Sequence, residues 1–169
     1  MTLRVDHAAE QAFARIVGAL RSARVDAGLS QVALSSGLPV RGRAISDWES
    51  GITEPTLEHL LQWSRDPGCR LVIVAPGGDP RQGFSCPRIG ETWELFERRR
   101  LAAPLRNRRV ASGLTQEKLG GLVGVSRDSI QRWELARVPP RPIALVVWAQ
   151  KLGYSVDLRS AGYLPMKRL

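Results

Sequence analysis

The chain has 169 residues, enough for one ordinary domain or two small ones. With 43% hydrophobic and 24% charged residues, it has the composition of a folded protein and not of a disordered or collagen-like chain. Its apolar stretches are far shorter than the roughly 20 residues that span a bilayer. Its first residues lack the apolar core of a signal peptide, so we expect a cytoplasmic protein with no membrane partner.

The charges are unevenly distributed along the chain. There are 25 Lys and Arg residues and 16 Asp and Glu residues, for a net charge of +9. Residues 1–74 are neutral overall, so the whole excess lies in residues 75–169. A basic excess of this size favours a polyanionic partner, and nucleic acid before a membrane.

The sequence contains an internal repeat with a spacing of 85 residues. Between Leu20 and Val74, 16 of 55 residues are identical to the residues 85 positions later. Repeats of this length are typical of two compact domains, because a solenoid needs at least about three repeats. The repeat therefore predicts two tandem units that fold alike.

Each unit begins with the pattern of an amphipathic helix. Phe13, Ile16, Val17 and Leu20 have the spacing of residues on one helical face. Gly28 is the residue type that ends such a helix, and the second unit has Gly113 in the equivalent place.

Two short helices follow in each unit. Ser30 and Thr115 are N-cap residue types and predict a helix that starts at the next residue. After a break, Ile45 and Trp48 lie three residues apart on one face of the second short helix. Their equivalents in the second unit are Ile130 and Trp133.

A last helix and a strand complete each unit. The apolar residues that predict this helix are Leu57, Leu60, Leu61 and Trp63, matched by Ile143, Leu145, Val146 and Trp148. After Gly68 and Gly153 the pattern changes to short β-branched runs, which predict strands at residues 69–74 and 154–159.

The segment between the units is rich in Pro and Gly, which is typical of a linker. A helix is expected to follow it, with either a kink or a new helix start at Pro104. We therefore predict an all-α fold of two domains, at residues 1–75 and 91–160, with a linker at 76–90 and a tail at 161–169.

Two short helices joined by a tight turn form a helix-turn-helix, whose second helix enters the DNA major groove. The segment GLTQEKLGGLVGVSRDSIQRWE, residues 113–134, resembles this motif in the Xre/Cro/cI-type repressors. The segment GLSQVALSSGLPVRGRAISDWESG, residues 28–51, resembles it less closely. The resemblance implies two tandem lambda-repressor-like domains in a bacterial or phage regulator whose partner is double-stranded DNA.

The resemblance also implies structural and phosphate-binding roles. In each unit it implies a partly buried ion pair that joins the first helix to the end of the recognition helix. These pairs are Arg24 with Glu49 and Arg109 with Glu134. Gln31 and Gln116 open the first short helices, and the resemblance makes them phosphate ligands.

The candidate base-reading residues lie on the second short helix of each unit. Arg is suited to guanine and Gln to adenine, while Asp accepts a hydrogen bond from cytosine. The candidates in the second unit are Ser126, Arg127, Asp128, Ser129, Gln131 and Arg132, with Arg137 in the next loop as a phosphate contact. The candidates in the first unit are Arg41, Arg43 and Ser46.

The first unit departs from the motif at several positions. Pro39 replaces the usual turn glycine, and Arg41 stands at the cap position that Ser126 fills in the second unit. Asp47 stands where the second unit has Arg132 and would face phosphates with the wrong sign. The first unit therefore either reads only a few bases or has become mainly an interaction module, and we favour the first alternative.

The two terminal strands are candidates to pair with each other, because an edge as apolar as LVIV needs a partner. Such pairing makes one chain a pseudo-dimer that binds a bipartite or asymmetric site as a monomer. The competing arrangement is a homodimer that carries four recognition helices.

The leading functional interpretation is a sequence-specific DNA-binding regulator, most simply a repressor, since no long segment is left for an activating or ligand-sensing domain. The alternative is an antitoxin-like interaction protein whose partner is a toxin or an antirepressor. An enzyme is the weakest interpretation, because the sequence has no HExxH, CxxC or Gly-rich phosphate loop. Two cysteines are too few for a four-ligand zinc site, so we expect no metal and no cofactor.

Overall fold

The computed structural model describes residues 1–81 and 86–163, which form a mostly helical protein with a small sheet. The first unit contains α1 (His7–Asp26), α2 (Gln31–Gly37), α3 (Gly42–Glu49), α4 (Leu57–Arg65) and β1 (Cys69–Val74). After β2 (Pro80–Arg81), the second unit contains α5 (Trp93–Ala111), α6 (Gln116–Val123), α7 (Arg127–Glu134), α8 (Pro142–Lys151), β3 (Ser155–Ser160) and the short 3₁₀ helix η1 (Ala161–Tyr163). The prediction of a helical tandem fold with a strand at the end of each unit is confirmed.

Local sequence explains where the helices start and end. The hydroxyl groups of Ser30 and Thr115 accept hydrogen bonds from the main-chain N–H three residues later, at 3.0 and 3.1 Å. These bonds satisfy donors that the first turn of a helix leaves free. Gly28 and Gly113 follow α1 and α5 with φ angles of 70° and 69°, a conformation that glycine adopts without steric cost.

Helix α5 continues through Pro104, so the structure excludes a new helix start at this residue. A proline inside a helix removes one hydrogen bond of the helical ladder. Pro104, Leu101 and Leu105 are all buried, and tertiary packing of this kind supplies most of the stability of helices in proteins. Tertiary packing therefore keeps α5 a single helix, whereas the local sequence was compatible with either a kink or a new helix start at Pro104.

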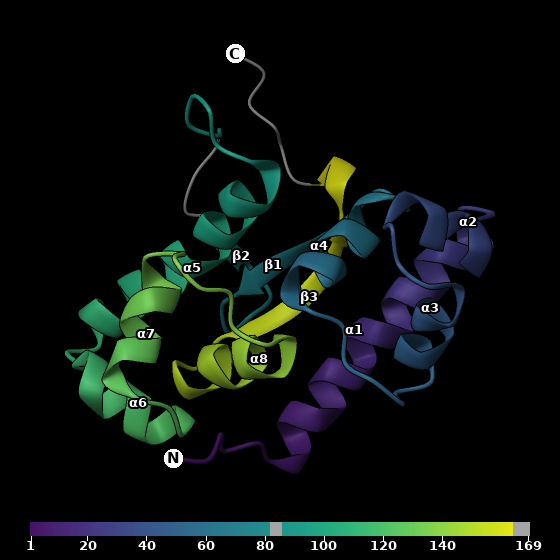
Figure 1. Cartoon of the computed structure of the whole chain (residues 1–169). Coiled ribbons are helices and arrows are strands. Elements are labelled where there is room, and N and C mark those ends of the chain that lie inside the picture. The colour runs from purple at the N-terminus through teal and green to yellow at the C-terminus, as the bar shows by residue number, and fades with distance from the viewer. Residues whose placement is uncertain (82–85, 164–169) are drawn as a thin grey trace.

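The two units are related by a pseudo-two-fold axis. Strands β1 and β3 pair antiparallel over their full lengths, with Val72 directly opposite Asp157. Asp157 is the repeat equivalent of Val72, so the axis passes between these two residues. In Figure 1, α3 and α7, and likewise α2 and α6, lie on opposite sides of this central strand pair. Consistent with the axis, α1 packs against α8 and β3, while α5 packs against α4 and β1.

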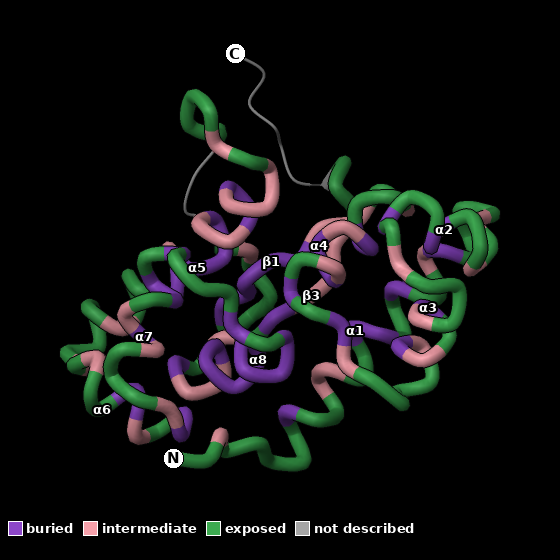
Figure 2. Tube along the Cα trace, viewed as in Figure 1, coloured by how far each residue is buried: buried purple, intermediate pink, exposed green. Residues whose placement is uncertain are grey.

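Both units contribute to one continuous hydrophobic core (Figure 2). In each unit a tryptophan of the recognition helix packs against a tryptophan of the next helix. The ring centroids are 5.9 Å apart for Trp48 and Trp63 and 5.6 Å apart for Trp133 and Trp148. Because the core is shared, burial of apolar surface fixes the two units relative to each other.

A buried charged cluster that the sequence did not predict joins α5 to β1. Glu97 accepts hydrogen bonds from Arg70 and Arg100, and Arg100 also donates to the Leu71 carbonyl at 2.5 Å. Burial raises the pKa of Glu97, but the bonds from the two guanidinium groups outweigh it and hold this pKa below its ordinary value. The equivalent of Glu97 in the first unit is Ala12, so the repeat gives no sign of this cluster.

Strand β2 pairs with β1 and lies inside the segment predicted as a linker, so part of that segment is ordered in the sheet. Residues 82–85 of the predicted linker and 164–169 of the predicted tail lie outside the described residues. Within the described ranges, each helix is too short or too polar to cross a membrane.

Candidate nucleic-acid interface

The two helix-turn-helix motifs are built on the same ion-pair framework. Glu49 Oε1 accepts from Arg24 Nε at 2.6 Å, and Glu134 Oε1 accepts from Arg109 Nε at 2.5 Å. In each unit Nη2 of the same arginine donates to the second carboxylate oxygen, at 3.1 and 3.0 Å. Nη1 donates to the carbonyl of Leu29 or its equivalent, which fixes the loop before the first short helix. This framework ties the end of each recognition helix to the first helix of its unit and so restrains the angle between them.

The glutamines at the start of α2 and α6 extend this framework. Gln31 Nε2 donates to Glu49 at 2.9 Å, and Gln116 Nε2 donates to Glu134 at 2.8 Å. Burial raises the pKa of Glu49, but hydrogen bonds from Arg24 and Gln31 outweigh it and lower this pKa from its ordinary value. Each glutamine is thereby held at the N-terminal end of its helix, where main-chain N–H groups favour an anion.

Recognition helix α7 exposes Arg127, Asp128 and Arg132 to solvent, while Ile130, Trp133 and Glu134 are buried. Ser126 caps the helix by accepting from the Ser129 N–H at 3.1 Å, and the two hydroxyl groups lie 3.0 Å apart. The exposed residues are Ser126, Arg127, Asp128, Arg132 and Arg137, whereas Ser129 and Gln131 are half-buried. Five of the seven predicted contact residues of the second unit are therefore accessible, and the other two are partly covered.

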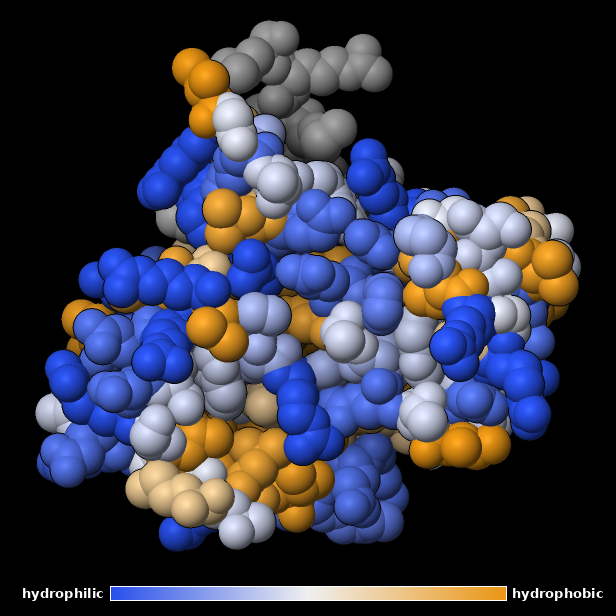
Figure 3. Space-filling view, viewed as in Figure 1, coloured by the Kyte–Doolittle hydropathy of each residue, from blue (hydrophilic) through white to orange (hydrophobic). Residues whose placement is uncertain are grey.

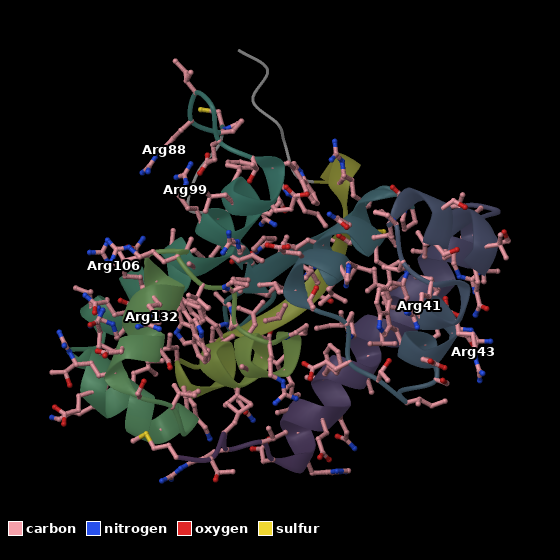
Figure 4. All side chains as sticks on the ribbon, in the orientation of Figure 1. Arg41, Arg43, Arg88, Arg99, Arg106 and Arg132 are labelled. Atoms are coloured by element: carbon pink, nitrogen blue, oxygen red, sulfur yellow. The ribbon has the colours of Figure 1, made fainter. Side chains whose placement is uncertain are left out.

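Arg106 on α5 also lies on this side of the molecule, although it is outside the residues that the motif predicts. Figure 4 shows it beside α7, on the same side as Arg132. Its equivalent, Arg21, lies 3.9 Å from Glu49, while Arg106 is exposed and has no ion-pair partner among the described residues. The identity of Arg21 and Arg106 across the repeat was the signal that could have identified this position.

Recognition helix α3 has a less favourable N-cap and preceding turn than α7. Arg41 occupies the N-cap position and makes no side-chain hydrogen bond to the helix. In the preceding turn, Pro39 has a φ of 20°, whereas a proline ring favours about −65°. Its equivalent, Gly124, has a φ of 89°, which glycine adopts freely.

The exposed surface of α3 carries a different set of residues. Arg41, Arg43 and Ser46 are exposed and Asp47 is half-buried. Figure 4 shows the side chains of Arg41 and Arg43 on the opposite side of the molecule from Arg106 and Arg132. In the same view, Figure 3 shows hydrophilic surface over both recognition helices, broken by apolar patches. Among the described residues, no group of three His, Cys, Asp or Glu side chains lies together as a metal site requires.

Comparison with known protein families matches both motifs. Residues 20–74 match the family described as "Helix-turn-helix", and residues 100–161 match the family described as "Helix-turn-helix domain". No curated protein and no solved structure matches the chain.

The fold and its two exposed recognition helices thus define a DNA-binding protein class, characteristic of regulators rather than of enzymes. Within that class the chain carries two tandem helix-turn-helix domains, consistent with an Xre-type motif present in two copies.

Proposed function

We propose that the chain is a sequence-specific transcriptional repressor that binds one bipartite, asymmetric site on double-stranded DNA as a monomer. The main support is the antiparallel pairing of β1 with β3, which gives α3 and α7 equivalent positions about a pseudo-two-fold axis. In dimeric regulators, such an arrangement lets two recognition helices enter successive major grooves about 34 Å apart. Here one chain carries both helices.

The two half-sites are expected to differ in sequence. Where α7 carries Arg127, Asp128 and Arg132, the equivalent positions of α3 are Gly42, Arg43 and Asp47. Because an arginine reads guanine and an aspartate accepts from cytosine, helices with different residues select different bases. Gln31, Gln116 and Arg137 are proposed to bind phosphates, which positions the protein without specifying sequence.

Selection of bound sequences from a random pool of double-stranded DNA tests this function. The proposal predicts enrichment of one site with two unlike halves centred about one helical turn apart. Enrichment of a palindrome would contradict the asymmetric reading, and no enrichment by the folded protein would contradict sequence-specific binding altogether.

The monomeric state is tested by sedimentation of the free protein. The proposal predicts a single species near the chain mass of 18.6 kDa. A species of about twice that mass would instead support a homodimer with four recognition helices.

A second candidate function is an interaction module of the antitoxin kind, in which the first unit binds a protein. Its support is Ile52, which is 72% exposed in the loop after α3, where the second unit has Arg137. Replacing Ile52 with Arg is expected to strengthen binding to DNA and to steepen its salt dependence by about one unit of slope if this loop faces phosphates. Unchanged affinity and slope would favour the protein-binding alternative for this loop.

A further inference from the structure

The N-terminal segment of the first unit, residues 1–5, crosses to the second unit. We call it the N-terminal arm. The Arg4 N–H donates to the Val123 carbonyl, at the end of α6, with an N···O distance of 2.8 Å. Leu3 packs against the core beside it. Figure 1 shows the N-terminus next to α6, on the other side of the molecule from α2 and α3.

The turn between α6 and α7 is shaped to receive this arm. A Cβ atom at Gly124 would collide with the Thr2 carbonyl oxygen and would lie 2.9 Å from the Arg4 nitrogen. Gly124 is therefore needed both for its positive φ and for the close approach of the arm.

The arm is held at its far end as well. The Asp6 carboxylate accepts from Gln150 Nε2 on α8 at 3.0 and 3.2 Å while it also caps α1 through the Ala9 N–H. These bonds, first that of Ala9 and then that of Gln150, lower the pKa of Asp6 from its ordinary value. The arm is thus attached on both sides of Arg4.

The pseudo-two-fold relation does not account for this contact. The residues equivalent to the arm are 86–90, which are all exposed and make no main-chain hydrogen bond to the turn between α2 and α3. The equivalent of Arg4 is Ile89, which is fully exposed. The position equivalent to Gly124 is Pro39, which carries a Cβ atom where the turn of the second unit has none.

This attachment places the main chain of Arg4 next to the turn that leads into α7. Only Val125 lies between Gly124 and Ser126, the N-cap residue of α7, and the N-terminal residues of a recognition helix are those that contact base edges. The Arg4 side chain is exposed and has no hydrogen-bond or ion-pair partner among the described residues. Phosphates border the groove on both sides of such a helix, and an arginine there binds them by charge-assisted hydrogen bonds.

We infer that the N-terminal arm is part of the DNA interface of the second unit, with the Arg4 guanidinium bound to the phosphate backbone beside the bases that α7 reads. This inference rests on the proposed function, since it requires α7 to lie in the groove. It makes the DNA interface of the second unit composite, because one of its contacts comes from the opposite end of the chain.

The test is the salt dependence of DNA binding by Arg4→Ala, measured on non-specific double-stranded DNA and on the selected site. The main-chain N–H of residue 4 is retained in this variant, so the arm stays attached. We expect weaker binding to both DNAs and a slope of log K against log salt that is smaller by about one. Arg4→Lys, which keeps the charge, is expected to keep the slope.

Arg15→Ala is the matched control. Arg15 is also exposed and without a described partner, but it lies on α1, which packs against α8 and β3. This control is expected to leave the slope unchanged. In hydroxyl-radical footprints, Arg4→Ala is expected to lose protection only beside the half-site whose sequence preference changes in Arg127→Ala.

The outcomes separate this inference from the proposed function. A wild-type slope for Arg4→Ala, or a loss of protection beside the other half-site, would overturn the inference while leaving the proposed function in place. A wild-type protein that shows no salt-dependent binding to double-stranded DNA would overturn both.

Discussion

The two units share a framework but differ at the surface that would meet DNA. Both keep the Arg–Glu ion pair, the glutamine bonded to it and the pair of packed tryptophans, with closely similar distances. The N-cap, the turn residue and the exposed face of the recognition helix differ between them. The comparison shows that the residues of the ion-pair framework are the same in both units, while the residues proposed to read sequence differ.

The largest effect on stability is expected from substitutions in the ion-pair framework that the two units share. Glu49→Ala and Glu134→Ala each remove one partner of a buried ion pair, because the two carboxylate side chains are 5% and 1% exposed. Leaving a buried arginine uncompensated costs about 3–5 kcal/mol, so we expect losses of this order in the free energy of unfolding measured by urea titration. Losses below about 1 kcal/mol in one variant would show that its unit does not depend on the framework.

The recognition helices are expected to contribute unequally to specificity. Arg127→Ala is expected to weaken binding to the selected site by about 1–3 kcal/mol and to relax base preference, because a bidentate contact to guanine is lost. Arg43→Ala removes an exposed arginine of α3, at the position equivalent to Asp128, and is expected to have a smaller effect, since α3 lacks a side-chain cap. Competition binding against single-base variants of the site measures both effects. A larger effect of Arg43→Ala would contradict the expectation that α7 contributes more to specificity than α3.

The caps give a reciprocal pair of substitutions. Arg41→Ser supplies the hydroxyl that α3 lacks, and Ser126→Ala removes the one that α7 uses. A side-chain cap contributes about 1 kcal/mol, so thermal or urea unfolding should show a gain for the first variant and a similar loss for the second. Loss of stability in both would mean that Arg41 stabilises α3 in another way.

The smallest expected effect concerns the residue after α7. Ala136 has a φ of 54°, whereas the first unit has Gly51 with a φ of 75° at the equivalent position. An L-residue in this left-handed conformation costs about 1–2 kcal/mol, and glycine in its place removes that cost. The greater freedom of glycine in the unfolded chain offsets about 0.5–1 kcal/mol of this gain. Ala136→Gly is therefore expected to raise the free energy of unfolding by between zero and about 1.5 kcal/mol, and a decrease would contradict this account of the strain.

Sequence was informative wherever the cause of structure was local or repeated. The caps at Ser30 and Thr115 and the pairing of the terminal strands follow from residue types and from the duplication. Contacts that only one unit makes had no counterpart in the repeat and were not predicted. Glu54 is an example, because it accepts from Arg141 at 2.6 and 3.1 Å and from the Ile143 N–H at 2.9 Å, across the boundary between the units.

The residues proposed to contact DNA illustrate a second limit. The sequence singled out Arg127 and Arg132 by their place in the motif, and the structure shows both exposed on α7. It could not identify Arg4, because that residue is more than a hundred positions away from the turn it contacts and lies outside both motifs. Such long-range placement depends on how the two units pack, which a motif does not encode.

The central claim, that one chain reads two unlike half-sites, is tested most directly by the mass of the protein–DNA complex on the selected site. Native mass spectrometry is expected to show one chain of 18.6 kDa bound per duplex when the whole bipartite site is present. Two chains per duplex, with no one-chain complex at limiting protein, would contradict the claim and would assign each half-site to a separate molecule.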